Sequence, residues 1–381
     1  LDLSQLAKKK KIKIEPLPSI DHSEIEYPEF NRNFYDQHPE ITVQTSESVS
    51  KMRRKMDIRV FGKKIPSPIM SFAHLNFEEV LIKRIIKQNF TKPTPIQCQA
   101  LPCALSGRDV IGIAKTGSGK TAAYIWPLII HILDQEELWK DDGPIGLVLV
   151  PTRELCMQVC NEAKKYCKAY GIEIVGLFGG ADPGEQWRRC KAGAEIIVAT
   201  PGRLIALIKG KATNLRRCTY TVLDEADKMF NMGFEYQIRS ILSNVRPDRQ
   251  TLLFSATMSP RIEKLCLDLI HDPVKITIGI QGSINKDIKQ IVEVVDKAED
   301  KIKWLQRRLG DLVTVGQTLI FAGTREDCES LAVDLTKRLE CTVLAYHGDK
   351  DQSERMEIVQ KFRKGDAKIM VATDIASRGL D

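Results

Sequence analysis

The sequence DVIGIAKTGSGKTAAYIWPLIIHIL, residues 109–133, contains three patterns in succession: an apolar run, a glycine-rich turn and an apolar stretch of helical length. Glycines in such a turn let backbone N–H groups close around a phosphate at the start of a helix. The stretch therefore predicts a P-loop, in which Lys120 reaches the β- and γ-phosphates of a nucleotide and Thr121 offers a hydroxyl to Mg²⁺. Ala114 replaces the first glycine of the strict pattern. The alternative is a turn that binds nothing, but the spacing, the Lys-Thr pair and both flanks favour the P-loop.

Apolar runs alternate with helical stretches from Phe72 onward, which predicts an α/β fold with parallel sheets covered by helices. The first set of runs is DVIGIA, GLVLVP, IEIVGLF, EIIVAT, YTVLDE, TLLFSAT and VKITIG, and the second is IVEVV, QTLIFAGT, CTVLAYHGD and KIMVATD. Residues 280–288, between the sets, look like a polar linker. We expect two doubly wound lobes, 72–279 and 289–381, the second incomplete at its C-terminal side. Ligands should bind where the strands end.

Composition excludes several classes of protein. The 381 residues fit two domains and an extension, and the net charge of +7 is compatible with a polyanionic partner. No apolar run is long enough to cross a bilayer, and the N-terminus lacks the apolar core of a secretory signal, so we expect an intracellular protein without a membrane partner. The ten cysteines are scattered without a C-x-x-C pair. Free thiols are therefore expected, and neither disulfides nor structural zinc.

Residues 1–71 are expected to form a largely extended N-terminal extension. A basic run at 8–13 is either a nuclear address or a nucleic-acid arm, and a solvated tail is the alternative. Aromatic residues are interspersed farther along, and they could dock the extension on a lobe: Tyr27, Phe30, Phe34, Tyr35 and Phe61.

The stretch VLDEADKM, residues 222–229, places three carboxylates within four positions directly after a buried run. Like charges this close raise one another's pKa unless cations or donors face them. A P-loop needs a carboxylate at a neighbouring strand end to hold Mg²⁺, and Asp224 stands in that context. Glu225 could orient or deprotonate the attacking water. The alternative is an acidic helix N-terminus stabilised by the helix dipole.

Two further sets of residues suggest binding. Gln97 in FTKPTPIQ could make paired hydrogen bonds to adenine, and Phe90 could stack on the base; ordinary packing at a helix start is the alternative. The motifs PTREL, GG and TPGR, at 151–155, 179–180 and 200–203, each follow an expected strand. Such residues hold phosphodiester backbones without reading bases. Singly each motif is only a turn, but three on one sheet edge suggest a surface that follows a nucleic-acid strand.

The motifs PTPIQ, AKTGSGKT, PTREL, TPGR, DEAD, SAT, LIFAGT, HGDKDQSER and ATDIASRGLD occur in this order over residues 72–381. The chain thereby resembles the DEAD-box family of ATP-dependent RNA helicases. The resemblance implies two RecA-like lobes that close on ATP, Mg²⁺ and single-stranded RNA, and that separate a short duplex locally. Within the family, stretches 19–35, 121–135 and 347–355 look most like a helicase associated with pre-mRNA splicing, with another spliceosomal subfamily as the alternative. A nuclear location and U2-type spliceosomal protein partners are implied.

The resemblance also implies a role for each matching residue. The adenine would be read by Phe90, Lys92 and Gln97. The phosphates and Mg²⁺ would be held by Ala114, Lys115, Thr116, Gly117, Ser118, Gly119, Lys120, Thr121 and Asp224. Catalysis and its coupling to lobe movement would involve Lys120, Asp224, Glu225, Asp227, Ser255 and Thr257. RNA would be contacted by Arg153, Gly180, Thr200 and Arg203 on the first lobe and by Arg355 and Thr373 on the second. Asp381 would contact the ATP ribose.

Three departures from the family pattern stand out. The final HRxGRxGR-type run with its arginine fingers does not occur within these residues. Arginine fingers are worth on the order of 10³ to 10⁵ in rate in related enzymes, so we expect this chain by itself to hydrolyse ATP poorly. Cys156 and Lys228 stand where the family commonly has Ala and Arg, and neither is expected to touch the chemistry.

Three functions remain open from the sequence. The first is an RNA helicase or RNA–protein remodeller. The second is an ATP-gated RNA clamp within a larger assembly, which would use the same residues. The third, a DNA translocase or another P-loop NTPase, is weakened by the joint presence of PTPIQ and DEAD.

Overall fold

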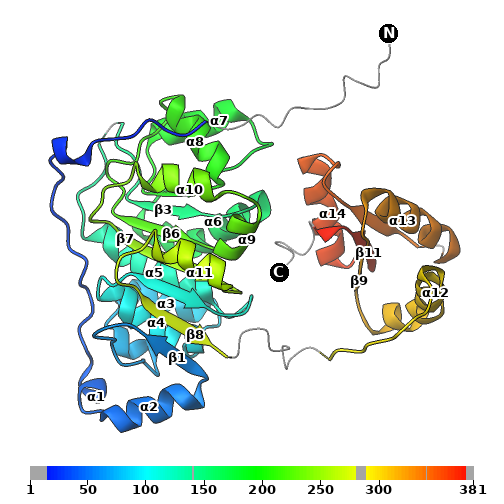
Figure 1. Cartoon of the computed structure of the whole chain (residues 1–381), viewed down its shortest axis with the longest axis horizontal. Coiled ribbons are helices and arrows are strands. Elements are labelled where there is room, and N and C mark those ends of the chain that lie inside the picture. Colours follow the sequence, from blue (N-terminus) through cyan, green and yellow to red (C-terminus); the bar gives the residue numbers. More distant parts are fainter. Residues whose placement is uncertain (1–14, 140, 280–288, 340, 375–381) are drawn as a thin grey trace. The chain divides into compact units, whose positions relative to one another are not determined.

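The computed structural model describes residues 15–139, 141–279, 289–339 and 341–374. The chain divides into two compact units between residues 283 and 284, within the linker expected at 280–288 (Figure 1). That linker, the basic run at 8–13 and Asp381 lie outside the described residues.

An eight-stranded sheet forms the centre of the first unit, in the order β1-β8-β2-β7-β6-β3-β5-β4. The strands are β1 (Ile58–Phe61), β2 (Val110–Ile113), β3 (Gly146–Leu149), β4 (Ile174–Leu177), β5 (Ile196–Ala199), β6 (Tyr220–Leu223), β7 (Gln250–Ser255) and β8 (Val274–Ile278). Neighbours from β8 to β4 are all parallel, which confirms the expected α/β fold and its seven strands. Strand β1, antiparallel to β8, was not expected.

Helices cover both faces of this sheet (Figure 1). They are α1 (Pro39–Thr42), α2 (Ser46–Lys55), α3 (Glu79–Lys87), α4 (Pro95–Leu105), α5 (Lys120–Leu133), α6 (Arg153–Cys167), α7 (Pro183–Ala192), α8 (Pro201–Lys209), α9 (Ala226–Asn231), α10 (Glu235–Leu242) and α11 (Pro260–Leu267). Side chains alternate along each strand, so Val148 of β3 joins one core with α3 to α6, while Leu147 and Leu149 join the other with α7 to α11. Strands buried on both faces explain the unbroken apolar runs in the sequence.

The N-terminal extension docks on the first unit, as its aromatic residues suggested. Tyr27 and Phe30 enclose the Arg246 guanidinium, whose carbon lies 4.7 and 4.8 Å from the two ring centres. Phe30 and Phe34 pack edge-on against the buried His131. Phe61 is the exception, with 79% of its surface exposed. The extension is also more structured than expected, because it forms α1, α2 and β1.

Contacts at His74 hold the extension at one more place. His74 Nε2 lies 3.1 Å from a Glu40 carboxylate oxygen, and the His38 ring stacks on His74 with ring centres 5.1 Å apart. These three side chains have the spacing of metal ligands. However, Nδ1 of each histidine accepts a backbone N–H, so each Nε2 carries the proton and His74 donates to Glu40. The geometry therefore indicates a tether between the extension and the segment before α3.

The second unit contains a three-stranded parallel sheet in the order β10-β11-β9 within its described residues. Its elements are α12 (Ala298–Val315), β9 (Thr318–Phe321), α13 (Arg325–Leu339), β10 (Val343–Tyr346), α14 (Gln352–Lys364) and β11 (Ile369–Ala372). The strand expected at 291–295 is wrong, since this segment is irregular there. Ile291, Val292 and Val294 are 71%, 83% and 91% exposed, so within the described residues the run has neither a pairing strand nor a buried face.

All ten cysteines are free thiols, nine of them buried, which confirms the expected absence of disulfides. Among the described helices, none combines the length and apolar character that a membrane span requires.

Candidate nucleotide site and nucleic-acid interface

The predicted functional groups of the first unit lie along one edge of its sheet. The register aligns Ile113 with Ser255, and Leu149 with both Leu223 and Ala199, so neighbouring strands end close together. The P-loop follows β2, the residues DEAD follow β6 and the residues SAT include the end of β7. The motifs PTREL, GG and TPGR follow β3, β4 and β5. Strand order therefore places the residues predicted to bind the nucleotide on one half of the edge and the residues predicted to bind RNA on the other.

The P-loop has the shape that phosphate binding requires. Gly117 and Gly119 adopt φ angles of 72° and 87°, which side chains rarely adopt, and nothing lies within 4 Å of where a Gly117 side chain would begin. The Lys120 amine, only 9% exposed, donates to the carbonyls of Ala114 and Lys115 at 2.7 and 2.9 Å. Ser118 Oγ is buried without a hydrogen-bond partner in the described part of the chain. The loop thus offers donors that a phosphate would satisfy.

Helix α4 is fastened to the P-loop through Gln97. Its side-chain oxygen accepts from the Thr94 N–H at 3.0 Å, and its nitrogen donates to the Gly119 carbonyl at 3.0 Å. Thr94 Oγ1 also donates to the Ser118 carbonyl at 2.8 Å. Phe90 packs edge-on against Trp126, with ring centres 5.5 Å apart. Gln97 therefore uses both polar atoms within the chain, and the adenine contacts of Phe90, Lys92 and Gln97 stay predictions.

Asp224 directly follows β6 and is buried, with only 3% of its surface exposed. Burial raises its pKa, while nearby Lys120 and the hydrogen bond from Tyr124 oppose that shift. The Tyr124 hydroxyl donates to one carboxylate oxygen at 2.9 Å, and the Glu225 N–H donates to the other at 2.9 Å. Burial lowers the pKa of Lys120, and the three carboxylates of the DEAD turn raise it. Lys120 is thus the positive partner that the crowded carboxylates required.

Glu225 adopts the left-handed conformation, with φ of 52° and ψ of 47°, directly before α9. Its carboxylate forms an ion pair with the Lys228 amine at 2.7 Å. Burial raises the pKa of Glu225, and the Lys228 hydrogen bond lowers it. The expectation that Lys228 stays clear of the chemistry is therefore wrong, because one helical turn brings its amine back to the carboxylate proposed to act on water.

Asp227 links the DEAD turn to the SAT residues. Its carboxylate accepts from the Thr257 hydroxyl at 2.5 Å and from the Thr257 N–H at 3.1 Å. Ser255 Oγ accepts from the Asp227 N–H at 3.3 Å and donates to the Thr257 carbonyl at 2.7 Å. The structure thus brings together the three residues expected to act as a unit.

The four RNA residues expected on the first unit gather at the ends of β3, β4 and β5. The Arg153 guanidinium lies against Gly180, with one nitrogen 2.1 Å from where a side chain there would begin. Thr200 precedes α8, and Arg203 donates from within α8 to the Ala181 carbonyl at 3.5 Å. Gly180 has a φ of 86°. The positive φ favours glycine at this position, and the absence of a side chain lets the Arg153 guanidinium lie against it.

The second unit places its two predicted RNA residues differently. Thr373 follows β11 and lines an open hollow of about 360 Å³ with Thr324 and Arg325, which follow β9. Arg355 is only 6% exposed, so the structure does not present it at the surface. Arg325 forms an ion pair with Asp349 at 2.5 Å.

Several contributors to these sites were missed by sequence reasoning. No sequence pattern pointed to the contact of Tyr124 with Asp224, because the two residues lie 100 positions apart and Tyr124 looks like one more apolar position of α5. Lys228 could have been found from its i,i+3 spacing to Glu225. Thr324 ends the quoted motif QTLIFAGT and Arg325 directly follows it, so the rule that ligands bind at strand ends could have pointed to both.

Comparison with known proteins agrees with this geometry. Residues 94–265 match the family described as DEAD/DEAH box helicase, and residues 300–381 match the helicase conserved C-terminal domain. The chain is 53% identical over 380 residues to the ATP-dependent RNA helicase DDX42 of Gallus gallus, covering 100% of this chain and 40% of that protein. It is 50% identical over 371 residues to the DEAD-box ATP-dependent RNA helicase 24 of Oryza sativa, covering 97% and 48%. The chain thus spans less than half the length of these relatives.

Solved structures share the fold as well as the sequence. The yeast DEAD-box splicing factor Prp28 is 33% identical with a TM-score of 0.60, and the match covers 89% of this chain and 80% of that one. A DEAD box protein from Methanococcus jannaschii is 34% identical with a TM-score of 0.51, covering 82% and 83%. The resemblance of stretches 19–35, 121–135 and 347–355 to DEAD-box protein 42, with the Prp5-like subfamily as the alternative, is in line with the 53% identity. Family matches on both units, together with solved relatives covered over most of their length, show that the chain belongs to the DEAD-box helicase family.

Proposed function

We propose that the protein is an ATP-dependent RNA helicase or RNA–protein remodeller, which couples ATP hydrolysis to closure of two lobes on RNA. The observation that carries this proposal is the division of one sheet edge in the first unit. Nucleotide-binding groups follow β2, β6 and β7, and backbone-binding groups follow β3, β4 and β5. The hydrogen bonds among Asp227, Ser255 and Thr257 lie in the half of the edge proposed to bind the nucleotide, and they link the ends of β6 and β7. A change at the phosphates can therefore be transmitted to neighbouring turns.

The residues present fit ATP and Mg²⁺. The helix start at Lys120, the unpartnered Ser118 hydroxyl and the open space at Gly117 suit a polyphosphate. Asp224 and Thr121 supply the hard oxygen ligands that Mg²⁺ prefers. When bound, Mg²⁺ neutralises charge that develops on the phosphates. Tyr124 holds the Asp224 carboxylate in place through its hydrogen bond, and Glu225 would orient the attacking water and take its proton.

The finer proposal is a role in pre-mRNA splicing, in the nucleus, with U2-type spliceosomal proteins as partners. Its support is similarity, because one solved relative is described as a splicing factor. RNA would be the substrate, single-stranded or as a short duplex.

The test is ATP hydrolysis without nucleic acid, with single-stranded RNA and with single-stranded DNA. We expect stimulation by RNA alone. Equal stimulation by DNA would support the translocase reading and overturn the RNA assignment.

Glu225→Gln separates a remodeller from a clamp, with Glu185→Gln as the control because it makes the same change at an exposed position of α7. A remodeller carrying the Glu225→Gln substitution should hydrolyse ATP at least a hundredfold more slowly and lose duplex separation. A variant that loses hydrolysis but keeps its cellular function and ATP-dependent RNA retention would instead identify an ATP-gated clamp.

A further inference from the structure

The extension carries a surface that the proposed function does not use, which we call the α2–β1 surface and define as residues 51–64. This stretch contains seven basic side chains and a single carboxylate, Asp57. Its excess of six positive charges compares with a net charge of +7 for the whole chain. Basic charge is therefore concentrated at α2 and β1 rather than spread evenly.

Helix α2 directs part of this charge to solvent. Val49, Met52, Arg53 and Met56 follow one another at helical spacing on the face toward the unit, and Val49 is buried. Arg53 is engaged there, donating to the Gln99 side chain at 2.9 Å and to the Pro66 carbonyl at 3.0 Å.

The opposite face carries Lys51, Arg54 and Lys55, at i, i+3 and i+4, and all three are exposed. None of them has an ion pair within the part of the chain that the structure describes. Their charges are thus available to a partner from outside.

Strand β1 continues the same surface. It is the outermost strand of the sheet, and Figure 1 shows it beside α2 at one end of the first unit. Ile58 and Val60 point inward, while Arg59 and Phe61 point outward on the other face. Phe61 is 79% exposed, unlike the other aromatic residues of the extension.

The loop after β1 adds Lys63 and Lys64, both exposed and without an ion pair among the described residues. Their carbonyls accept from the Arg108 guanidinium, at 2.5 and 3.4 Å, so the backbone that presents them is held in place.

We propose that the α2–β1 surface binds single-stranded RNA, independently of ATP, as a second contact beside the one at the strand ends. Lys51, Arg54 and Lys55 would bind phosphates, and Phe61 would stack on a base. Phe61 stands between Arg59 and Lys63 in the sequence, and an exposed aromatic ring beside basic side chains is the combination that holds single strands without reading sequence. An acidic polypeptide would match the charge but would leave the exposed ring without a role. The choice of RNA rests on the proposed function, whereas the location of the surface does not.

The test is fluorescence anisotropy of a labelled twelve-nucleotide RNA, titrated with this chain without nucleotide at several salt concentrations. The variant is Lys51→Gln/Arg54→Gln/Lys55→Gln, and the matched control is Lys168→Gln/Lys211→Gln/Lys264→Gln, three lysines on separate elements. Each phosphate contact to a single strand contributes about 0.7 to the salt slope, so the variant should lower the slope by about 2. Its affinity should fall at least tenfold, whereas the control should change less than threefold.

Phe61→Ala should weaken binding about fivefold or more, as expected for loss of one stacked base, and Phe61→Trp should keep it. Equal effects of the α2 variant and the dispersed control would overturn the proposal. So would displacement of the RNA by poly-glutamate as efficiently as by unlabelled RNA, or an unchanged affinity of Phe61→Ala.

Failure of the proposed function would look different. ATP hydrolysis would then lack RNA stimulation, while anisotropy in the absence of ATP would still distinguish the α2 variant from its control.

Discussion

At the scale of single residues, Glu225 is the most constrained member of the candidate site. A left-handed conformation costs an ordinary residue roughly 1–2 kcal/mol, and residues held this way cluster at functional sites. The turn places two adjacent carboxylates in different surroundings: Asp224 beside Lys120 and Tyr124, and Glu225 beside Lys228. This arrangement allows one carboxylate to serve a metal while the other serves water.

Lys228→Gln is predicted to change the pH dependence of RNA-stimulated ATP hydrolysis. Glu225 must be ionised to accept a proton, so activity is lost as pH falls through its pKa. Removing the Lys228 amine removes the hydrogen bond that lowers this pKa, while burial still raises it. The acidic limb of kcat/KM against pH should therefore move to higher pH.

Lys228→Arg is the control, because arginine keeps the charge. Its acidic limb should stay within a few tenths of a unit of the unmodified protein. A Lys228→Gln profile that overlays the unmodified one would show that the ion pair does not set the pKa of Glu225.

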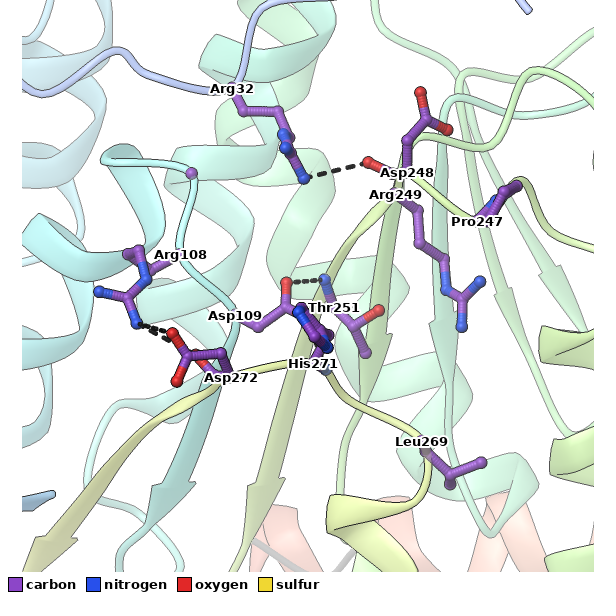
Figure 2. A pocket seen from close by; sticks show the side chains of 11 residues that line it. Arg32, Arg108, Asp109, Pro247, Asp248, Arg249, Thr251, Leu269, His271 and Asp272 are labelled. Atoms are coloured by element: carbon purple, nitrogen blue, oxygen red, sulfur yellow. Dashed lines mark hydrogen bonds and ion pairs between the residues drawn. The ribbon is translucent and has the colours of Figure 1, made fainter. Parts of the chain in front are cut away.

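At the scale of elements, one contact between the extension and the first unit is a close approach of Arg32 to the backbone of Gly107. Arg32 lies over Gly107 beside a hollow of about 470 Å³ at the starts of β2, β7 and β8, and its guanidinium donates to the Asp248 carbonyl at 3.1 Å (Figure 2). A side chain at Gly107 would begin 2.7 Å from Arg32 Cβ and from the Arg32 carbonyl oxygen. Glycine is needed there both for its φ of 72° and for this contact.

Gly107→Ala is predicted to release the extension. Gly171→Ala is the matched control, because its φ is 70° but nothing lies within 4 Å of the added carbon. Both variants bear the same backbone strain, so a difference between them measures the contact with Arg32. Limited trypsin digestion should cleave after Arg32 several times faster in Gly107→Ala than in Gly171→Ala. Equal cleavage rates would indicate that the extension does not depend on this approach.

At the scale of the whole molecule, one sheet carries function at one end and stabilising contacts at the other. Asp109, at the start of β2, accepts the Thr251 N–H at 2.8 Å and the His271 N–H at 3.4 Å, joining β2 to the starts of β7 and β8 (Figure 2). Burial raises the pKa of Asp109 to about 6, against these two hydrogen bonds. The stability of the first unit should therefore depend on pH through a group far from the nucleotide.

Asp109→Asn is predicted to remove part of that pH dependence. Between the unfolded pKa near 3.8 and the folded pKa of about 6, the folded state holds a proton that the unfolded state has released. The free energy of unfolding should thus decrease as pH rises through this window and stay level above it. An asparagine side chain cannot ionise, so the curve of the variant should lack this decrease, which amounts to up to about 3 kcal/mol in the unmodified protein.

Urea unfolding followed by tryptophan fluorescence measures this effect, because Trp126 is fully buried in the core of the first unit. Asp57→Asn is the control, since Asp57 is exposed. Parallel stability curves for Asp109→Asn and the unmodified protein from pH 4 to 8 would contradict the prediction.

Local sequence patterns were sufficient to predict the P-loop, the DEAD turn, the seven strands from β2 to β8 and the docking of the extension's aromatic residues. Each of these depends on neighbours in sequence: glycines for a turn around phosphate, unbroken apolar runs for strands buried on both faces, and aromatic rings that must leave water. Chain length and the polar linker between two sets of strands predicted the two lobes, and the family resemblance added a role for each motif.

Contacts between segments that are distant in the sequence could be identified only from the folded structure. Tyr124 reaches Asp224 because α5 packs near β6, Gln97 reaches Gly119 because α4 lies beside the P-loop, and β1 exists because β8 offers it a partner. Residues 291–295 have the apolar pattern of a strand but no neighbour to pair with among the described residues. Periodicity shows which face of an element is apolar, but which elements meet depends on the strand order of the folded sheet, and periodicity does not encode that order.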